Sequence, residues 1–421
     1  MSFQQLSQLS LLQPSETTEK AYRHIPDRAY EDLHLSQVAR AIAGDRLGAH
    51  RFDRILRRLP VDISVSRYRS EILADLRTHG ELAKELHREV DSCRELASAR
   101  YSYSEDLLET VGRLTELELF VERVRGFSKV LGRWRGVFRS QGLRRFDEAL
   151  REATESGTFK TLEVELPKLR KGLRNRRSLT VGINLDDKMR PMAATLLSVN
   201  EEPFGERTSL QRVLSRFTPE GAQQPLHTNE LPESLRRSDG SAPALSPLFR
   251  DLEQLLRSIV RPVAKGLRQY SYLQTTLIAE LAEELSLFLG VASLCDSLES
   301  RGFPTAPPEL LLAEGPHPSA TLRGLYALSL PDAAGVQEVV RNDYLLEEGD
   351  ALLILTGPNS GGKTTYLRAV AQAQFLAQHG FPVPAREARL PVVSGILSLF
   401  AAGDTEEATL EALLAELGDR R

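Results

Sequence analysis

The sequence predicts an α plus α/β fold, in which a long helical region with a small β insertion precedes a partial α/β domain. Three observations carry this prediction. Apolar residues recur at helical spacing over residues 68–153 and 249–300, whereas residues 178–200 alternate with the period of a strand. After Gly302 the apolar runs become short and are separated by Pro and Gly, which is typical of an α/β domain.

The composition is that of an ordinary folded protein. Its 421 residues, 41% hydrophobic and 27% charged, suffice for about two or three domains. No apolar run approaches the ~18 residues of a membrane span, and the N-terminus lacks a secretory signal. Cys93, Cys295 and the eight histidines show no metal-ligand spacing. We therefore expect a cytoplasmic protein with inert thiols, no zinc site and no membrane contact.

The two helical stretches differ in length and in the number of helix-breaking residues. Apolar residues such as Ile72, Leu73 and Leu76 mark the first stretch, which has few breakers. The second could span about 75 Å if it were straight, although Pro262 should kink or divide it. Long helices on both sides of a β insertion predict an arm that goes out, carries the insertion at its tip and returns.

The β insertion is predicted as a hairpin or small sheet. Leu179, Val181, Ile183 and Leu185 alternate with smaller or polar residues, and the pattern resumes at residues 195–199. Residues 201–246 are rich in Pro, Ser, Gly, Gln and charge, so we expect them to form a mobile connection.

A glycine-rich loop is the most informative feature. Residues 351–365 read ALLILTGPNSGGKTT and satisfy the pattern G-x-x-x-x-G-K-[ST]. The apolar run Ala351–Leu355 before it predicts a buried strand. After it, Leu367, Ala371 and Phe375 share one face of a predicted helix that ends near Gly380. Strand, glycine-rich turn and helix together predict part of a P-loop NTPase α/β domain.

The chemistry of this loop is phosphate binding. Glycines let backbone N–H groups wrap phosphates, and the helix start adds its partial positive charge. We expect Mg²⁺ with ATP or ADP as the ligand, Lys363 bridging the β and γ phosphates and Thr364 donating a hydroxyl ligand to the metal. The expected nucleotide contacts are Gly357, Pro358, Asn359, Ser360, Gly361, Gly362, Lys363, Thr364 and Thr365.

Hydrolysis needs more than this loop. A second carboxylate must hold the metal and another residue must position water, usually at an Asp-Glu that ends a later apolar strand. No such strand follows Thr365, and Asp404, Glu406 and Glu407 lead into the helix-like run Ala408–Leu417, which favours an exposed acidic face. We assign no catalytic residue, and whether the chain is an enzyme stays open.

Three motifs resemble the ATPase domain of MutS-type DNA mismatch repair proteins. They are Asn342-Asp343, LLILTGPNSGGKTTYLRAV at 352–370 and LAQHGFPVPA at 376–385, and the Gly-Gly-Lys-Thr-Thr form resembles the shorter MutS-like branches. More weakly, residues 31–35 resemble the helical core of that family. Residues 182–186 fall where its members carry a clamp on long lever helices.

The resemblance implies a function. It implies an ATP-binding, DNA-binding protein of DNA mismatch or recombination repair, which forms a homodimer through the ATPase domain and closes on DNA as a nucleotide-regulated clamp. It also implies adenine contacts near residues 339–342, which adds Asn342 to the nucleotide site. The acidic strand end, the signature segment and the mismatch-reading domain of the family find no match, and the Phe-x-Glu triplets at 146–148 and 204–206 are interpreted as chance.

With the resemblance, the sequence predicts five parts. They are an N-terminal segment at 1–60, a helical core and lever at 61–155, a clamp-like β insertion with its mobile connection at 156–246, returning lever helices at 247–301 and a partial P-loop ATPase domain at 302–421.

Two basic stretches could neutralise DNA phosphates. The net charge is −4, yet eight basic residues and no acid lie between Arg123 and Phe146, a run that is either a solvated face or a DNA contact. The second stretch precedes the predicted hairpin, where a clamp would meet a duplex. There we expect backbone contacts without sequence reading from Lys168, Arg170, Lys171, Arg174, Arg176 and Arg177.

One alternative belongs to another functional class. In it, the chain is a non-hydrolysing remnant or a protein-interaction module whose helices bind a partner and whose nucleotide is structural.

Overall fold

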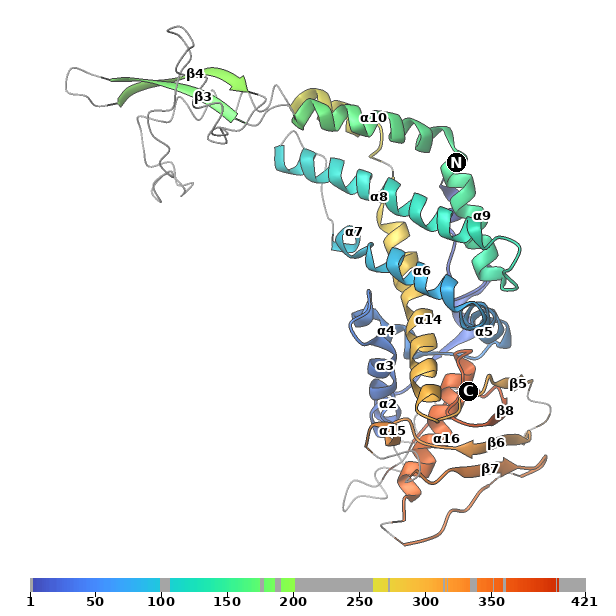
Figure 1. Cartoon of the computed structure of the whole chain (residues 1–421). Helices are drawn as coiled ribbons and strands as arrows, with labels where there is room; N and C mark the ends of the chain where they lie inside the picture. The colour runs from blue at the N-terminus through green and yellow to red at the C-terminus, as the bar shows by residue number, and fades with distance from the viewer. Residues whose placement is uncertain are drawn as a thin grey trace. The chain divides into compact units, whose positions relative to one another are not determined.

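The protein is described by a computed structural model (Figure 1). The chain divides into two compact units, unit 1 with residues 1–98, 122–156 and 276–421, and unit 2 with residues 99–121 and 157–275. The described part is mainly helical with small sheets, as predicted. The described residues are 3–98, 107–174, 178–185, 191–200, 260–271, 273–312, 315, 317–333, 339–350, 352–358, 361–398 and 400.

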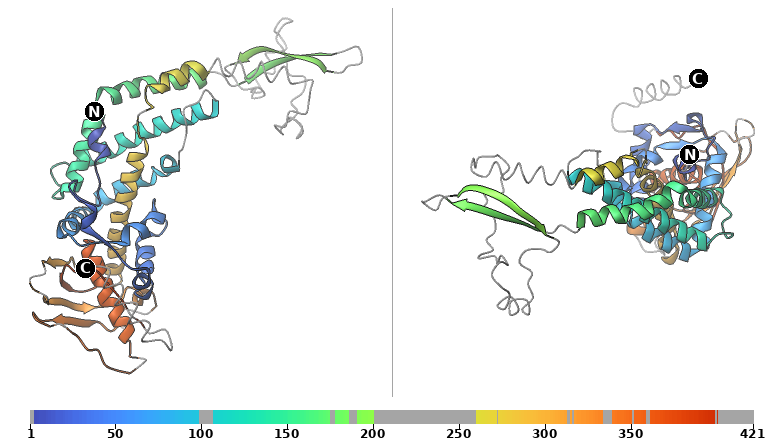
Figure 2. Two further views of the ribbon diagram at one scale, coloured as in Figure 1. Left: turned by 180° about the vertical axis from the view of Figure 1, so that it is seen from behind. Right: turned by 90° about the horizontal axis from the view of Figure 1, so that it is seen from above.

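Helices form the core of unit 1 (Figure 2). The C-terminal part of α8 (Leu107–Arg133) joins them, and β1 (Tyr22–His24) pairs antiparallel with β2 (Arg58–Pro60) beside them. The helices are α1 (Gln4–Ser7), α2 (Asp27–Asp32), α3 (Leu35–Ala43), α4 (Ala49–Leu56), α5 (Ile63–Thr78), α6 (Gly80–Asp91), α7 (Arg94–Ser98), α9 (Gln141–Glu155), α14 (Thr276–Ser300), α15 (Leu330–Ala333) and α16 (Lys363–Gln378).

Helix α14 is the centre of this core. It packs against α3, α5, α6 and α7, and side chains all around it are buried, including Leu281, Leu285 and Phe288. A helix that is apolar all round can only be stable where neighbours cover every side. The helical prediction for this part of the returning stretch is therefore confirmed.

A buried carboxylate positions the start of α9. The Asp75 carboxylate on α5 accepts hydrogen bonds from the backbone N–H of Arg139, at 3.0 and 3.1 Å, and of Ser140, at 2.9 Å. The carboxylate thereby satisfies one donor that the helix start leaves without a partner, the N–H of the N-cap residue Ser140, and also the N–H before it. Close packing of α9 on α5 also needs Gly142, because a Cβ there would lie 2.4 Å from Ile72 Cδ1.

The N-terminal segment is held by side chains of two core helices. Glu284 on α14 accepts the Leu11 N–H at 2.6 Å, and Arg69 on α5 donates to the Leu12 carbonyl at 2.7 Å. Burial raises the pKa of Glu284, and Leu11 is fully buried. Residues 10–12 are therefore an integral part of the helical core.

A four-stranded mixed sheet lies against α16. Its strand order is β5 (Glu309–Leu311), β8 (Glu387–Pro391), β6 (Ala320–Leu325) and β7 (Asn342–Leu346), with β5 parallel to β8 and β6 antiparallel to both of its neighbours. Three alanines of α16 pack on apolar residues of the sheet and its loops. The buried residues are Ala369, Ala373, Ala377, Leu322, Val383 and Leu390.

The strand predicted before the glycine-rich loop is not formed in the described residues. Residues 352–355 have no regular secondary structure, and Leu352 and Ile354 are each 76% exposed. Residues 352–355 pair with none of the described strands, whose order in the sheet is β5-β8-β6-β7. Apolar sequence alone makes no strand without a paired neighbour. The predicted helix after the loop is confirmed as α16.

Unit 2 contains the predicted hairpin. Strands β3 (Ser178–Leu185) and β4 (Pro191–Asn200) pair antiparallel, with Ser178 opposite Asn200. The unit also contains the first part of α8, α10 (Gly157–Arg174) and a helix over residues 260–268. This last helix includes Pro262 and ends at residue 268, and the residues before 260 lie outside the described part, so the predicted kink or division at Pro262 stays a prediction. The predicted connection at 201–246 lies outside the described residues.

A buried ion pair fixes the chain that follows the helix over residues 260–268. Arg113 on α8 donates to the carbonyls of Tyr270, at 3.3 Å, and Leu273, at 3.1 Å, and it pairs with Glu116 at 2.6 Å. Turn carbonyls that no helix can satisfy are thus held by a charged donor.

Among the described helices of the chain, none is long and apolar enough to cross a membrane.

His379 directly follows α16 and is fully buried. Its ring lies 4.4 Å from the Phe375 ring, and its Nδ1 lies 2.8 Å from the Phe375 carbonyl. Burial, reinforced by the charge of Arg69, lowers the pKa of His379 to about 3. The fold therefore holds this histidine neutral.

We predict that His379 makes the folded state sensitive to acid. In the unfolded chain the imidazole takes up a proton near pH 6.5, whereas the folded protein resists this down to about pH 3. Its contribution is therefore complete above pH 6.5 and falls by about 1.4 kcal/mol for each pH unit below it. Urea unfolding at pH 7.5 and 5.5 should show this loss for the wild type and a smaller loss for His379→Gln.

The exposed His24 provides the matched control. His24→Gln should keep the pH dependence of the wild type. An equal loss of stability on acidification in the wild type and in His379→Gln would contradict the assignment.

Candidate functional site

The glycine-rich loop enters α16 through two unusual backbone positions. Gly357 has φ 150° and Gly362, directly before the helix, has φ 78°. A Cβ at either position would meet no atom within 4 Å, so the glycines are required by backbone conformation and not by space. The sequence pattern thus selects a conformation that turns the chain into the first turn of α16.

Lys363 is the first residue of α16 and its side chain folds back over the loop. The ammonium donates to the carbonyl oxygens of Gly357, at 2.5 Å, and Pro358, at 2.8 Å. The N–H groups of the first helical turn lack helical partners and carry partial positive charge. A positive side chain and a helix start therefore point to the same place, which is an arrangement for binding an anion.

A cavity of about 640 Å³ opens beside the loop. Its lining includes the apolar residues Leu325, Tyr326, Leu330 and Val339 together with the loop and Lys363. A flat apolar group next to a phosphate-binding loop is the combination that a nucleotide needs.

Most of the described residues predicted for the nucleotide site line this cavity. They are Asn342, Gly357, Pro358, Gly361, Gly362, Lys363 and Thr365. Thr364, predicted as the metal ligand, is exposed on the first turn of α16 and does not line the cavity. Asn359 and Ser360 lie outside the described residues.

Tyr366 and Asp343 also line the cavity; both lie in motifs that carry the family resemblance, but neither was predicted as a site residue. The Tyr366 hydroxyl donates to the Asp343 carbonyl at 2.9 Å, which ties α16 to β7. The Asp343 carboxylate accepts the Gly324 N–H at 2.8 Å and so ties β7 to β6. Such contacts across elements leave no signature in a local sequence window.

Two further side chains of α16 fasten the loop to the helical core. Arg368 donates from Nε to the Asp32 carbonyl at 2.7 Å, and Gln372 donates to the Leu33 carbonyl at 3.0 Å. These carbonyls lie where α2 ends, so α16 supplies partners that the end of α2 lacks. The sequence pointed to residues 31–35 only through the family resemblance.

Metal and thiol chemistry find no site in the described part of the chain. No group of three or more His, Cys, Asp or Glu is placed to hold a metal among the described residues. Cys93 and Cys295 are buried, as expected, and burial raises their pKa values to about 12 and about 11. Asp404, Glu406 and Glu407 lie outside the described residues.

Three of the eight bases in the run at 123–145 form ion pairs with acids of unit 1. Arg123 pairs with Glu89 and Glu122, Arg133 with Glu85 and Arg135 with Asp147. Two aromatic residues of the run, Phe127 and Phe138, are buried. These pairs favour the interpretation of the run as structural rather than as a DNA contact.

The described side chains of the second basic stretch differ in their exposure to solvent. Arg170 donates to Glu118 at 2.9 Å and to the Thr115 hydroxyl at 2.8 Å, so its guanidinium is held within unit 2. Lys168 and Lys171 are exposed. The side chains of Arg174, Arg176 and Arg177 lie outside the described part.

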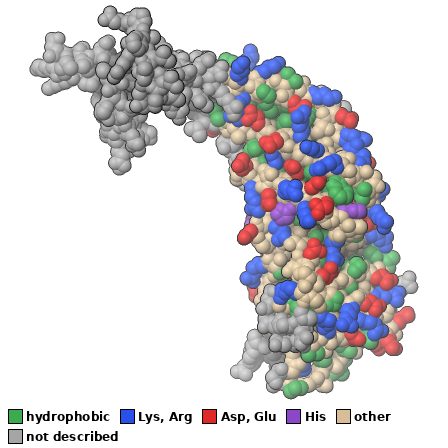
Figure 3. All heavy atoms as spheres, in the orientation of Figure 1, with side chains coloured by type: hydrophobic (Ala, Val, Ile, Leu, Met, Phe, Trp, Pro, Cys, Tyr) green, Lys and Arg blue, Asp and Glu red, His purple; other side chains and the backbone are tan. Residues whose placement is uncertain are grey.

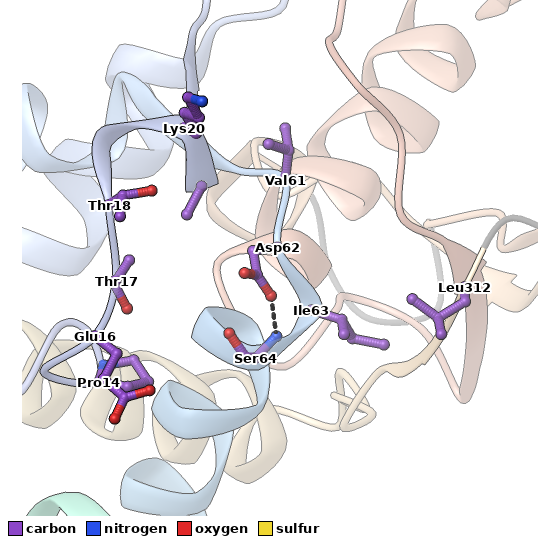
Figure 4. A pocket seen from close by; sticks show the side chains of 11 residues that line it. Pro14, Glu16, Thr17, Thr18, Lys20, Val61, Asp62, Ile63, Ser64 and Leu312 are labelled. Atoms are coloured by element: carbon purple, nitrogen blue, oxygen red, sulfur yellow. Dashed lines mark hydrogen bonds between the residues drawn. The ribbon is translucent and has the colours of Figure 1, made fainter.

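A second cavity, of about 660 Å³, lies between the N-terminal segment and the start of α5 (Figure 4). Thr17, Thr18 and Lys20 line one side, and Ser64 lines the other. Asp62 also lines the cavity. Its carboxylate caps α5, because it accepts the Ser64 N–H at 2.8 Å. The sequence predicted no site there.

Comparison with protein families gives two matches. Residues 61–301, more than half of the chain, match the MutS2 N-terminal domain, and residues 353–419 match MutS domain V. The second match contains the glycine-rich loop and all of α16.

Curated relatives agree with these matches. The DNA mismatch repair protein MutS of Listeria welshimeri is 26% identical over 283 residues, which cover 65% of this chain and 29% of the relative. MutS of Lysinibacillus sphaericus is 40% identical over 81 residues, 19% of this chain and 10% of the relative. The DNA mismatch repair protein MSH2 of Saccharomyces cerevisiae is 29% identical over 181 residues, 38% of this chain and 18% of the relative.

The chain thus spans less than a third of the length of these relatives. Its matches nevertheless extend over the helical region and the loop-bearing region alike. The chain belongs to the MutS family.

Proposed function

We propose that this chain binds ATP and DNA and acts in DNA mismatch or recombination repair as a nucleotide-regulated clamp. The observation that carries the proposal is the cavity where Lys363, the glycine-rich loop and the start of α16 meet, in a chain of the MutS family. The five parts predicted from the sequence, with the ATPase part at 302–421, belong to the same proposal.

In the proposed complex the phosphates lie over the loop and the base lies against the apolar residues of the cavity lining. The Lys363 ammonium, now on two backbone carbonyls, would exchange them for phosphate oxygens, which bind a cation more strongly. Tyr326 and Val339 would cover the base, and Asn342 would contact it from the edge of the cavity.

Magnesium suits the residues at the start of α16. Thr364 is exposed in the first helical turn and can offer its hydroxyl oxygen, while phosphates and water complete an oxygen shell. The ion would neutralise phosphate charge. Among the described residues we assign no group that activates water, so the proposal includes binding but no turnover.

A homodimer through the loop-bearing region is part of the proposal. Val340 is 74% exposed, and Leu352 and Ile354 are each 76% exposed, all beside the loop. Exposed apolar side chains grouped in this way mark surfaces that bind other proteins. The same group would serve the alternative function, a protein-interaction module with a structural nucleotide.

Nucleotide binding is tested at Lys363. Lys363→Ala should weaken Mg-ATP and Mg-ADP about 10- to 100-fold, since a hydrogen bond to a charged group contributes about 1.5–3 kcal/mol. Isothermal calorimetry measures both affinities. The control is Lys84→Ala, which removes an exposed lysine of α6 and should leave the affinity unchanged.

Equal affinity of the wild type and Lys363→Ala would sink the nucleotide assignment. Dimer formation that does not respond to ATP in a sizing experiment would leave the nucleotide site standing and favour the interaction module.

DNA binding at the proposed clamp is tested at Arg174, Arg176 and Arg177. Each neutralised phosphate of a duplex releases about 0.9 counterion, so replacing the three by Ala should flatten the salt dependence of affinity by up to about three units. All duplex sequences should be affected alike. Fluorescence anisotropy at several salt concentrations gives the slope.

The control variant removes three exposed basic residues of unit 1, Arg54, Lys84 and Arg88, which should leave the slope unchanged. If both triple variants lose affinity equally, the effect is one of net charge and the assignment to residues 174–177 fails.

A further inference from the structure

The end of α16 that lies away from the loop is buried in the helical core. The helix is about 24 Å long, so its last turn is far from Lys363 at its start. Phe375, Gln378, His379 and Phe381, at or just after this end, are fully buried. The surface seen in Figure 3 carries basic and acidic side chains intermixed, whereas this end of α16 makes its polar contacts out of solvent. A buried polar side chain needs hydrogen-bond partners, so the contacts of Gln378 are informative.

Both halves of the Gln378 amide are hydrogen-bonded. Its Nε2 donates to the Pro60 carbonyl at the end of β2, at 2.6 Å, and to the Val393 carbonyl at 3.1 Å. Its Oε1 accepts the Val393 N–H at 3.0 Å and the amide of Gln374 at 2.7 Å. One side chain thus joins α16, β2 and the segment after β8. Neither a methionine nor a carboxylate can both donate and accept in this way.

Helix α5 is fastened to the same end of α16. The Ser66 hydroxyl donates to the Gln378 carbonyl at 2.5 Å. Just beyond the helix the two main chains approach each other closely, because a Cβ on Gly380 would lie 2.2 Å from the Ser66 carbonyl oxygen. Phe381 meets Phe288 of α14 edge-on, with ring centroids 6.3 Å apart. Residues of α5 and of α14 therefore both contact the chain at this end.

A second joint lies nearer to the loop. There Gln372 is buried and donates to the Leu33 carbonyl at 3.0 Å, and Arg368 holds the same corner between α2 and α3. Six residues separate Gln372 from Gln378, which is about 9 Å along the helix. Each joint contains one buried glutamine, so the two can be altered separately.

We infer that nucleotide bound at the loop stabilises β2 and α5 through the buried end of α16, with Gln378 and Ser66 as the links. The inference rests on the proposed nucleotide site and deepens it, because it names how the site is connected to the helical core. A ligand that binds only when α16 is in place adds RT ln(1 + [L]/Kd) to the free energy of any opening that displaces α16. Opening of β2 or α5 breaks bonds to the end of α16, so both segments gain this protection. Gln378 is a positioning residue, since it lies at the end of α16 opposite to the loop.

Amide hydrogen exchange measures this protection segment by segment. The full chain is compared without nucleotide and at 100 times its Kd for Mg-ATP, with Kd measured by calorimetry. Exchange in peptides that cover β2 and α5 should slow by up to about a hundredfold on binding. The loop and α16 should show the same slowing.

Two variants remove the links one at a time. Gln378→Met keeps the length of the side chain and should reduce the slowing in β2, whereas the milder Ser66→Ala should reduce the slowing in α5. The loss of one hydrogen bond should lower the response about 2- to 10-fold in each case. Each variant is studied at 100 times its own Kd, so saturation is equal. A purely structural role would change exchange with and without nucleotide alike and leave their ratio unchanged.

Gln372→Met is the matched control. It also replaces a buried glutamine of α16, but the bond that it removes goes to Leu33. It should keep the response of β2 and α5 to nucleotide. Thermal melting shows whether each variant is folded, and if Gln378→Met is not, Ser66→Ala decides alone.

The outcomes separate this inference from the proposed function. If calorimetry shows no nucleotide binding, the proposed site fails and the inference fails with it. If nucleotide binds and protects the loop and α16 but not β2 or α5, only the inference is overturned. The same holds if Gln378→Met and Ser66→Ala keep the wild-type response, or if Gln372→Met reduces the response of β2 and α5 to the same extent.

Discussion

The structure around the candidate site depends on one helix that must satisfy two different neighbours. On one side α16 presents the small apolar residues Ala369, Ala373 and Ala377 to the mixed sheet. On the other, Arg368, Gln372 and Gln378 donate to main-chain carbonyls of the helical core, Gln378 to the Pro60 carbonyl at 2.6 Å. Alanines allow close approach to a sheet, whereas buried carbonyls demand donors. The order of residue types along α16 therefore records which neighbour each position meets.

The same helix fixes the geometry at its two ends. At its start Gly362, with its positive φ, turns the chain into the helix and places Lys363 over the loop. Near its middle, Arg368 and Gln372 hold the corner between α2 and α3. At this corner His34 has φ 54°, and it is the only non-glycine residue with a positive φ among the described residues. Such a conformation costs energy and persists where surrounding contacts impose it. The loop and this corner are thus parts of one rigid arrangement within unit 1.

Predictions from sequence succeeded where the information is local. Helical spacing of apolar residues, the glycines of the loop and the stop signal at Gly380 predict α16, and alternating apolar residues predict the β3–β4 hairpin. Each of these signals lies within a few residues of the element that it specifies. The strand expected over residues 351–355 failed because a strand is a property of a pair, and its apolar residues carry no information about a partner. The contacts of Asp343 and Tyr366 were missed for the same reason, since they join segments that are distant in sequence.

Charge shows this limit most clearly. In the basic run at 123–145, Arg123, Arg133 and Arg135 pair with acids that lie elsewhere in unit 1 or beside the run, as Arg135 does with Asp147. What decides the outcome is where the acids lie, and a carboxylate such as Glu118 is matched to Arg170 only by the packing of two helices. How many bases of a basic run are held in ion pairs therefore depends on which acids the fold brings to it. That property belongs to the folded unit and can be read only after the acids have been placed.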